Sequence, residues 1–376
     1  MIPFTKPTVV GSEEAYLSEA IRVGQLSGDG IFTQRCHDWF EAKLRCRKAL
    51  LTPSCTSALE MAALLVDLEP GDEVIMPSYT FVSTANAFVL RGAKIVFVDI
   101  RPDTMNLDEN KIEAAITSRT KVIVPVHYAG VSCEMGTIME IAARHNLWVV
   151  EDAAQGMMSE YNGKYLGTLG HIGTYSFHAT KNYTSGGEGG LLIINDPTLA
   201  ERAEIIREKG TNRSNFLRGK IDKYTWVDIG SSFLPSELQA AYLYAQLECS
   251  EKIHTDRLNL WNVYYKELSH ITSIDLAVIP GKCKHNGHIF YIKLKDAIER
   301  KRLINYLVDF GVFSTSHYVP LHSSPWYLAN EGVIPKLNVT DSESSRILRL
   351  PIFSGMDVTQ VLYVSGLIKE YFGNAE

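Results

Sequence analysis

Two short segments place an acid and an amine where chemistry could occur. The segment Leu147-Trp-Val-Val-Glu-Asp152 runs from apolar residues to a carboxylate at its C-terminal end. The segment Thr174-Tyr-Ser-Phe-His-Ala-Thr-Lys181 reads as a strand that ends in a polar turn holding one lysine. In open α/β sheets, ligands bind outside the carboxyl ends of the strands. We therefore expect Asp152 and Lys181 to face a common cleft.

Each of these two residues also has an ordinary structural explanation. A strand-end aspartate often caps the next helix, and a lysine beside glycines is often part of a solvated turn. Together, however, they meet the needs of pyridoxal phosphate, which takes a lysine for a Schiff base and an acid for its pyridinium nitrogen. The run Ser185-Gly-Gly187 lets the backbone fold back into the apolar strand 191–195. The pair makes pyridoxal phosphate the candidate cofactor.

Two further strand ends could complete such a site. Pro53-Ser-Cys-Thr-Ser57 follows the strand 49–52 and opens a helix of small and apolar residues. Free backbone N–H groups and the helix dipole would bind an anion there, although an ordinary Ser/Thr cap explains the stretch equally well. Phe81 follows the strand 73–76 and could stack on a flat cofactor, although phenylalanine is more often part of a core. The fingerprints of P-loop and dinucleotide sites are missing.

Composition limits the classes of function. The chain has 376 residues, 45% hydrophobic and 21% charged, which predicts a globular protein of about two domains. A net charge of -6 argues against general binding to nucleic acid or membrane surfaces. The six cysteines lack C-x-x-C pairs and metal-like spacing, so we expect reduced thiols, no metal site and a cytoplasmic protein. The apolar stretch near Phe88 is interrupted by Arg91 and Lys94, which disfavours a membrane span.

Strands alternate with helices over most of the chain. This pattern predicts a largely parallel sheet with helices on both faces, and thus an α/β fold. We expect a large domain over residues 1–250, with an N-terminal segment at 1–30, and a small α+β domain over 251–376. Further expected elements are helices at 12–23, 33–43, 85–90, 108–116, 135–145, 197–208, 237–248, 252–268, 299–310 and 358–371, and strands at 94–99, 121–126, 290–294 and 313–322.

The segment from Arg207 to Lys223 is basic in a chain that is acidic overall. It holds six basic residues and two acids. A solvated charged loop explains this composition, and so does a site for a phosphate-bearing substrate, because arginine and lysine bind phosphate well. Both interpretations stay open at this point.

With these residues in place, the chain resembles the DegT/DnrJ/EryC1/StrS family of sugar aminotransferases, which are pyridoxal-phosphate enzymes acting on nucleotide-linked keto-sugars. The resemblance covers nearly the whole chain. It rests on four segments, namely Ser54-Cys-Thr-Ser-Ala-Leu59, Glu151-Asp-Ala-Ala-Gln155, Ser176-Phe-His-Ala-Thr-Lys181 with Gly187-Glu-Gly-Gly190, and His317-Tyr-Val-Pro-Leu-His322.

The resemblance implies an aspartate-aminotransferase-like fold and an activity. The expected reaction moves an amino group from L-glutamate to the 4-keto carbon of a dTDP-4-keto-6-deoxyhexose. Alternatives are an aminotransferase for a 3-keto-sugar or a UDP- or GDP-sugar, a pyridoxal-phosphate-dependent sugar dehydratase, and a non-catalytic cofactor-binding protein. Dehydratases of the family carry histidine where Lys181 stands, and a regulatory protein would normally add a DNA-binding segment.

The resemblance also implies roles for individual residues. Lys181 forms the Schiff base, Asp152 pairs with the pyridinium nitrogen, and Gln155 contacts the ring hydroxyl. The other expected contacts are to the cofactor phosphate from Cys55, Thr56 and Ser176, to the cofactor ring from Phe81, and to the substrate from Arg213, Tyr318 and His322.

A second subunit is the expected partner. Active sites of the family are shared within a homodimer, often through an asparagine in the loop before the helix that here begins at Glu237. In this chain the loop reads Gly230-Ser-Ser-Phe233, so a serine stands where asparagine is common.

Overall fold

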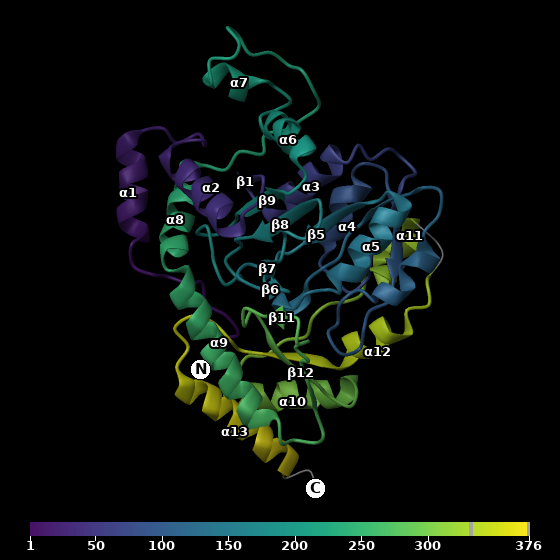
Figure 1. Cartoon of the computed structure of the whole chain (residues 1–376). Helices are drawn as coiled ribbons and strands as arrows, with labels where there is room; N and C mark the ends of the chain where they lie inside the picture. Colours follow the sequence, from purple (N-terminus) through teal and green to yellow (C-terminus); the bar gives the residue numbers. More distant parts are fainter. Residues whose placement is uncertain (331–333, 374–376) are drawn as a thin grey trace.

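The large sheet of the protein has seven strands in the order β1-β9-β8-β5-β4-β2-β3 (Figure 1). The computed structural model describes residues 1–330 and 334–373. Neighbouring strands are parallel except that β9 is antiparallel to both β1 and β8. The strands are β1 Lys48–Thr52, β2 Glu73–Pro77, β3 Lys94–Val98, β4 Thr120–Ile123, β5 Trp148–Asp152, β8 Ile172–Ser176 and β9 Gly190–Ile194. The mostly parallel sheet expected from the sequence is confirmed.

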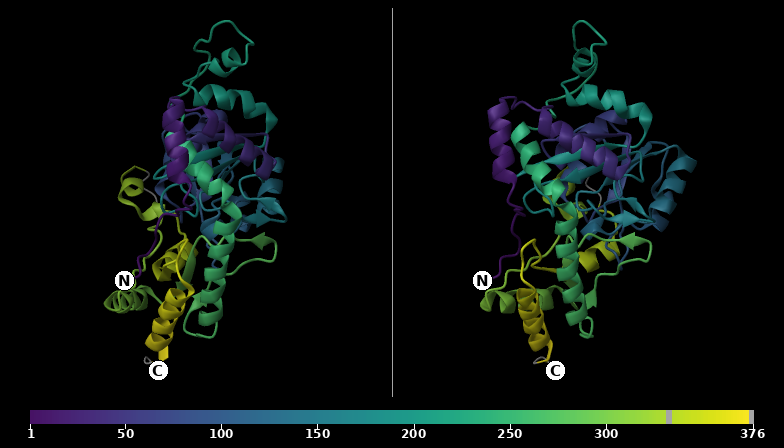
Figure 2. Two further views of the ribbon diagram at one scale, coloured as in Figure 1. Left: turned by 90° about the vertical axis from the view of Figure 1, so that its left-hand side faces the viewer. Right: turned by 60° about the vertical axis from the view of Figure 1, so that its left-hand side comes forward.

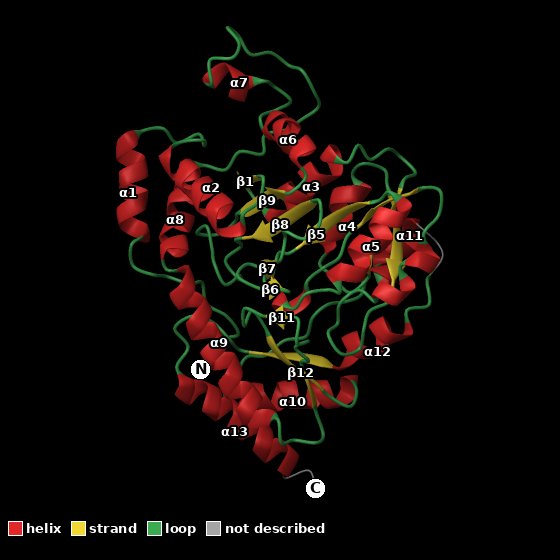
Figure 3. Ribbon diagram, in the orientation of Figure 1, coloured by secondary structure: helices red, strands yellow, loops and turns green. Residues whose placement is uncertain are grey.

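Helices cover both faces of this sheet because successive strand residues point to opposite sides. Leu51 and Ile193 pack with α2, α5 and α8, whereas Leu50 and Leu192 pack with α3, α4 and α6. Figure 3 shows the strands enclosed by these helices. The helices are α2 Ile31–Leu44, α3 Cys55–Leu65, α4 Val82–Val89, α5 Met135–His145, α6 Ala200–Arg207 and α8 Glu237–Glu248. Both faces are therefore buried, which explains why the strands are almost wholly apolar.

One glycine sets the spacing at the edge of the sheet where β1 and β8 end. Gly190, the first residue of β9, pairs with Thr52 of β1 on one side and with Ser176 of β8 on the other. A Cβ atom at Gly190 would lie 2.3 Å from the carbonyl carbon of Ser54, just before α3 begins. The start of α3 can approach the sheet this closely only because residue 190 has no side chain.

The C-terminal part has its own three-stranded antiparallel sheet, in the order β10-β12-β13. A separate apolar cluster joins this sheet to α9, α10 and α13. The N-terminal residues reach this part, since the Ile2 N–H donates to the Gly311 carbonyl at 2.8 Å. The elements are α9 Ser250–Leu268, β10 Asp275–Leu276, β12 Phe290–Lys293, α10 Ala297–Asp309, β13 Ile347–Leu350 and α13 Val358–Gly373. We retain the division near residue 250, where Cys249 separates α8 from α9, as a proposal.

Several short elements complete the structure. The helix α7 and its flanking loops project from the body of the molecule in every view (Figure 2). No helix among residues 1–330 and 334–373 is long and apolar enough to cross a membrane. The remaining elements are α1 Glu13–Val23, α7 Arg213–Leu217, α11 Pro325–Asn330, α12 Asn338–Arg346, β6 Glu160–Tyr161, β7 Lys164–Tyr165, β11 Cys283–Lys284, and the short turns η1 Glu109–Lys111, η2 Glu113–Ala115, η3 Tyr128–Gly130, η4 Pro197–Leu199 and η5 Leu321–Ser323.

Two expected elements are wrong. The helix expected at 108–116 consists of the two 3₁₀ turns η1 and η2, in which the backbone bonds span three residues, as from Ala115 to Ile112. Ile112 is the one fully buried apolar side chain of this stretch. The stretch therefore lacks the apolar face that would hold an α-helix against the core.

The strand expected at 313–322 is also absent. Thr315 forms one isolated bridge with Arg349, and Leu321 then bonds to the Ser78 carbonyl in the large sheet region. Pro320 has no N–H to donate to a ladder, and the segment crosses to the large sheet instead of extending the small one.

Replacing Gly190 with alanine should destabilise the protein by about 1–3 kcal/mol, because the added methyl group meets backbone that cannot rotate away. Urea unfolding followed by circular dichroism measures this change. The control is Gly366→Ala in α13, where a Cβ atom meets nothing within 4 Å and a helical glycine becomes a better helix former. Equal stabilities of the two variants would contradict the role given to Gly190.

Candidate active site

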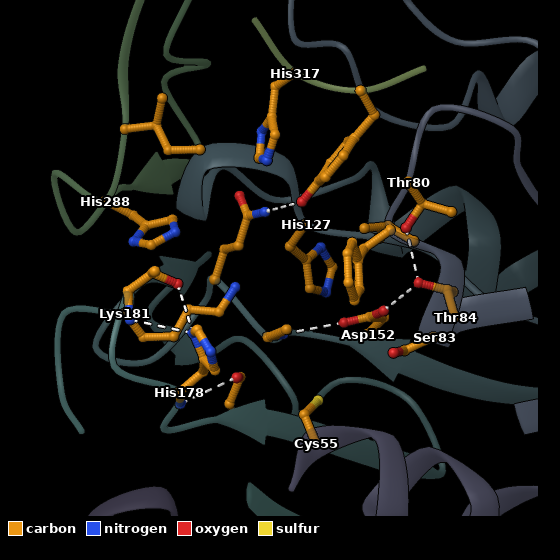
Figure 4. Close-up of a pocket in the computed structure, with 18 of the residues that line it drawn as sticks. Cys55, Thr80, Ser83, Thr84, His127, Asp152, His178, Lys181, His288 and His317 are labelled. Atoms are coloured by element: carbon orange, nitrogen blue, oxygen red, sulfur yellow. Dashed lines mark hydrogen bonds between the residues drawn. The ribbon is translucent and has the colours of Figure 1, made fainter. Parts of the chain in front are cut away.

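A cavity of about 540 Å³ lies at the carboxyl edge of the parallel strands. Its walls come from the ends of β5 and β8, from the first turns of α3 and α4, and from β13 and the segment around Tyr318 in the C-terminal part. Figure 4 shows Lys181 and His288 on one side of this cavity and Asp152 with Thr84 on the other. The common cleft expected for Asp152 and Lys181 is present.

Lys181 lies in the turn that follows β8. The turn is closed by the Lys181 N–H, which donates to the His178 carbonyl at 2.9 Å. Burial is the main cause that lowers the pKa of the Lys181 amine below its ordinary value, and the Arg349 charge lowers it further while Asp152 opposes both. A low dielectric disfavours the charged ammonium. The amine is thus biased toward its neutral, nucleophilic form.

Asp152 is the last residue of β5 and is held by two donors. The Thr84 hydroxyl donates to its Oδ2 at 2.7 Å, and the Ala154 N–H donates to its Oδ1 at 3.1 Å. Thr84 in turn lies 2.8 Å from the Thr80 hydroxyl. Because both oxygens are fixed, the carboxylate keeps one orientation toward the cavity.

The neighbour Glu151 anchors the same strand end from the opposite face. Its buried carboxylate accepts hydrogen bonds from the N–H groups of Gly167, Leu169 and Gly170 at 2.8, 2.7 and 2.5 Å. It also lies 2.9 Å from Nε2 of His127, whose Nδ1 accepts from the Cys133 N–H at 3.1 Å. His127 therefore carries its proton on Nε2 and ties the end of β4 to β5. This network holds the strand that positions Asp152.

The start of α3 is a helix N-terminus with hydroxyl groups around it. Ser54 caps the helix, since its side chain accepts from the Ser57 N–H at 3.1 Å. The Thr56 hydroxyl donates to Ser83 at 2.8 Å, so α3 and α4 present hydroxyls to the same space. Burial raises the pKa of the Cys55 thiol, which favours its neutral form. Ser176, at the end of β8, lines the cavity next to this helix start.

Two aromatic side chains and one amide, those of Phe81, Tyr318 and Gln155, form another wall of the cavity. The Phe81 side chain is 56% exposed, and its ring centroid lies 6.3 Å from that of Tyr318. Gln155 is buried, accepts from the Ala129 N–H at 2.7 Å and donates to the Tyr318 hydroxyl at 3.1 Å. The exposed Phe81 ring therefore faces open space instead of filling a core, as a stacking role needs.

The structure gathers most of the expected site residues in this one cavity. It is lined by Cys55, Thr56, Phe81, Asp152, Gln155, Ser176, Lys181 and Tyr318. Two expected substrate residues lie outside that lining. Arg213 begins the projecting α7, 3.6 Å from Glu208, and buried His322 contacts Ser78 at 2.7 Å and Asp341 at 3.1 Å. Their substrate roles stay predictions.

Sequence reasoning missed other residues of the cavity, including Ser83, Thr84, His288, Arg257 and Arg349. Ser83 and Thr84 follow Phe81 at a strand end, so their position was a signal that could have been used. Arg349 carried no such signal, because it lies within a short strand whose partner strand is distant in the sequence.

These residues fit pyridoxal phosphate. The start of α3 offers helix N–H groups for the phosphate, together with the hydroxyls of Thr56, Ser83 and Ser176. Asp152 offers an oriented acid for the ring nitrogen. The Lys181 amine, whose pKa is lowered by burial, and the exposed ring of Phe81 border the space between them. Each polar group of that cofactor thus has a matching backbone or side-chain group in the cavity.

Comparison with known proteins agrees with this chemistry. A profile of the DegT/DnrJ/EryC1/StrS aminotransferase family matches residues 7–369. An uncharacterised protein of Methanocaldococcus jannaschii, MJ1066, is 33% identical over 91% of this chain and 90% of its own length. GDP-perosamine synthase of Escherichia coli O157:H7 is 30% identical over 99% of both chains.

A solved structure confirms the fold. The aminotransferase TlmJ from Streptoalloteichus hindustanus superposes with a TM-score of 0.91 over the whole of both chains, at 28% identity. The large mostly parallel sheet and the small antiparallel sheet are thus those of an aminotransferase fold. The chain belongs to the DegT/DnrJ/EryC1/StrS aminotransferase family and is a pyridoxal-phosphate-dependent sugar aminotransferase.

Proposed function

We propose that this protein transfers an amino group from L-glutamate to the 4-keto carbon of a dTDP-4-keto-6-deoxyhexose. One observation carries the proposal: the buried Lys181 amine and the oriented carboxylate of Asp152 line the same cavity. Such a pair suits proton transfer at a carbon next to nitrogen, which is the chemical core of amino transfer.

Four segments support the choice of sugar. Pro53-Ser-Cys-Thr56, the run from Met76 to Phe88, Gly210-Thr-Asn-Arg213 and Asp228-Ile-Gly-Ser-Ser232 resemble dTDP-4-amino-4,6-dideoxygalactose transaminase of enterobacterial common antigen synthesis. The proposed product is therefore dTDP-4-amino-4,6-dideoxygalactose. It would serve cytoplasmic synthesis of a surface polysaccharide such as that antigen or a lipopolysaccharide O-antigen.

Each site residue has a proposed task. Pyridoxal phosphate, when bound, supplies an aldehyde that accepts the amino group and a ring that withdraws electrons. Asp152 keeps a proton on the ring nitrogen, Gln155 orients the ring hydroxyl, and Phe81 packs on the ring face. The start of α3, with Cys55, Thr56 and Ser176, binds the phosphate. Leaving the ring nitrogen without its acid costs about 3–5 kcal/mol, which slows the reaction at least about 100-fold.

Lys181 has two proposed tasks. The amine would hold the cofactor through its aldehyde, and once released from it the same amine would hold and move the proton of the amino-transfer step. A lysine would also compete with the product amine for the cofactor, which would leave the amino group on the sugar. A dehydratase of this family has histidine at the position of Lys181, which favours amino transfer for this chain.

A GDP-linked sugar is the second candidate substrate. The observation that favours it is the 30% identity with GDP-perosamine synthase over 99% of both chains. The two candidates differ in the nucleotide base and in the configuration of the sugar, and a direct comparison of substrates separates them.

We also propose a homodimer with shared active sites. The projecting α7 region carries a large exposed aromatic side chain, Trp226, which is 79% exposed, together with Tyr224 and Phe216. Apolar side chains on an extended arm gain stability when they pack on a second subunit. Arg213, at the start of α7, would then reach the phosphate-bearing substrate of the partner.

The first prediction of this proposal concerns the pH at which Lys181 reacts. Only the neutral amine attacks an aldehyde, so the rate of attachment rises with pH until the pKa is passed. Because burial lowers the pKa of Lys181, the midpoint should lie below 10.5. Apoprotein is mixed with pyridoxal phosphate, trapped with borohydride and mapped by mass spectrometry. Exposed Lys301 of α10 is the internal control. A main adduct on another lysine would contradict the assignment of Lys181 as the residue that binds the cofactor.

The second prediction concerns the product. Protein incubated with ¹⁵N-glutamate and dTDP-4-keto-6-deoxyglucose should yield a sugar nucleotide that contains ¹⁵N at C4, seen by mass spectrometry and NMR. Lys181→Ala should abolish turnover. A parallel reaction with a GDP-linked 4-keto-6-deoxyhexose tests the second candidate. A deoxygenated sugar without nitrogen would overturn amino transfer in favour of dehydration.

The third prediction concerns assembly. Light scattering should give twice the chain mass of 42.0 kDa. Trp226→Asp should weaken the dimer and lower activity together, because a charge on the arm cannot be buried cheaply. The control is Ile298→Asp, a change at an exposed apolar residue of α10, outside the arm and the cavity lining. A fully active 42.0 kDa monomer is incompatible with shared sites.

A further inference from the structure

A serine, a histidine and an aspartate are joined by hydrogen bonds near one wall of the cavity. Ser78 follows β2, His322 lies in the turn η5, and Asp341 lies in the first turn of α12. Oγ of Ser78 lies 2.7 Å from Nδ1 of His322, and Nε2 of the same ring lies 3.1 Å from Oδ1 of Asp341. Ser78 and His322 are both buried, and neither of these two described residues lines the cavity. Any effect of this pair on the reaction must therefore act through other residues.

The three residue types are those of a hydrolase triad, but their geometry does not suit a nucleophile. In such triads the serine faces Nε2 of the histidine and the aspartate faces Nδ1, whereas here the ring is reversed. Because an ionised carboxylate only accepts, Nε2 of His322 carries a proton, and Nδ1 of the neutral ring accepts from the Ser78 hydroxyl. The serine oxygen also accepts the backbone N–H of His322 at 3.0 Å. Ser78 is thus buried and fully engaged within the protein.

Ser78 begins the turn that carries two residues of the site. Its carbonyl accepts the Thr80 N–H at 3.1 Å, and Phe81 then occupies the cap position of α4. Thr84, in the first turn of this helix, donates to Asp152 at 2.7 Å. A shift of Ser78 would therefore move both the Phe81 ring and the hydroxyl that orients the Asp152 carboxylate.

His322 ends the segment that carries Tyr318. Both the backbone N–H and the ring of His322 bond to Ser78. Four residues earlier, the Tyr318 hydroxyl accepts from Gln155 at 3.1 Å, and its ring centroid lies 6.3 Å from that of Phe81. The bond between Ser78 and His322 thus joins the two segments that bring Phe81 and Tyr318 to one wall of the cavity.

We propose that His322 is a positioning residue for amino transfer, which acts through Ser78 on Phe81 and on the support of Asp152. This inference rests on the proposed packing of Phe81 on the ring of pyridoxal phosphate. The Phe81 side chain is 56% exposed, so few side-chain contacts hold it and its direction depends on the backbone that carries it. Groups that must stay within about 0.5 Å of a working geometry need neighbours that are themselves fixed. His322 would then serve the reaction without touching the substrate.

Asp341 links this pair to α12. The neighbouring Thr340 donates its N–H and its hydroxyl to Oδ1 of Asp99, after β3, at 2.8 and 2.7 Å. The start of α12 is therefore fixed on the large sheet, and the Asp341 carboxylate needs little ordering to reach His322. Its side chain is 58% exposed, so the contact adds little energy. Its effect is to keep the proton on Nε2, which leaves Nδ1 as the acceptor for Ser78.

The first test needs no cofactor. Ser78→Ala removes the acceptor of the His322 N–H, and His322→Ala removes the partner of the Ser78 hydroxyl. In the apoprotein of either variant, hydrogen exchange in peptides covering 78–89 and 317–323 should be about three- to tenfold faster, as mass spectrometry measures. The double variant should match Ser78→Ala, because the same bond is lost only once.

A matched control removes another imidazole from the large sheet. Half-buried His171 accepts the Val149 N–H at 2.9 Å near the start of β5, outside the cavity lining. His171→Ala should leave exchange in both peptides unchanged. If His322→Ala does not fold, Ser78→Ala, which removes a single oxygen, carries each test.

The second test uses the holoenzyme and reports the orientation of the cofactor. The visible circular dichroism of bound pyridoxal phosphate should change in Ser78→Ala and His322→Ala but not in His171→Ala. Release of 2-oxoglutarate from glutamate in a single turnover should slow about tenfold, while the glutamate concentration for half the maximal rate changes less than about twofold.

Two substitutions of the histidine separate its two nitrogens. An asparagine amide reaches the place of Nδ1 and can accept from Ser78, so His322→Asn should restore most of the spectrum and of the rate. A glutamine amide reaches the place of Nε2 instead, so His322→Gln should restore neither. Equal behaviour of these two variants would overturn the proposal.

The remaining outcomes are also decisive. If Ser78→Ala and His322→Ala lower only the free energy of unfolding, with an unchanged spectrum and rate, the pair is merely structural and the proposal is overturned. Labelling of Ser78 by a fluorophosphonate would reveal a reactive serine and overturn it as well. An unchanged spectrum in Phe81→Leu, beside changed spectra in the other variants, would remove the packing of Phe81 and leave the pair acting through Asp152. No measurement uses a sugar nucleotide, so failure of the proposed sugar transfer leaves this inference standing.

Discussion

The close approach of three backbone segments at Gly190 is the constraint on which the site depends. This residue pairs with the last residue of β1 and the last residue of β8, so the segments leading to α3 and to Lys181 leave the sheet side by side. The antiparallel direction of β9 makes this possible, because its first residue lies at the edge where its neighbours end. The missing side chain then lets the start of α3 lie against the sheet. The start of α3, proposed to bind the phosphate, and the turn of Lys181 are thereby placed together by backbone geometry.

The electrostatics of the cavity follow from this placement. Asp152 is fixed by Thr84 and by the backbone, so its charge has one direction. Lys181 shares the same enclosed space, and burial lowers its pKa. Arg349, from the small sheet, lines the same cavity, and its positive charge also lowers the pKa of Lys181. The large sheet thus provides the groups proposed to hold the cofactor, while the C-terminal part adds a cation to the cavity wall.

The N-terminal residues contribute to the closure of the cavity. Ile2 bonds to Gly311 in the C-terminal part, and this contact carries Phe4 to the cavity wall, where its ring supports Arg349. The arm that contains α7 extends in another direction, away from the body of its own chain. We propose that this arm packs on a second subunit, because it carries exposed aromatic side chains.

The sequence by itself determined those features that depend on local patterns. Apolar runs ending in Asp152 and in the Lys181 turn predicted the strand ends, because side-chain burial on both faces of a sheet leaves a continuous apolar stretch. The helix expected at 108–116 failed, since helical propensity does not show whether an apolar face has a core to meet. The strand expected at 313–322 failed because its path is set by contacts with the distant Ser78.

Tertiary structure alone decided which side chains share the cavity. It brought Tyr318 to Gln155 and left His322 with Ser78 and Asp341, although both residues belong to one short motif. It also placed Arg349 in the lining of the same cavity as Lys181, across a long separation in sequence. Contacts between residues so far apart arise from sheet pairing and from packing between layers, and neither leaves a periodic signal in the chain. The strand ends could therefore be predicted, whereas the partners that they meet required the fold.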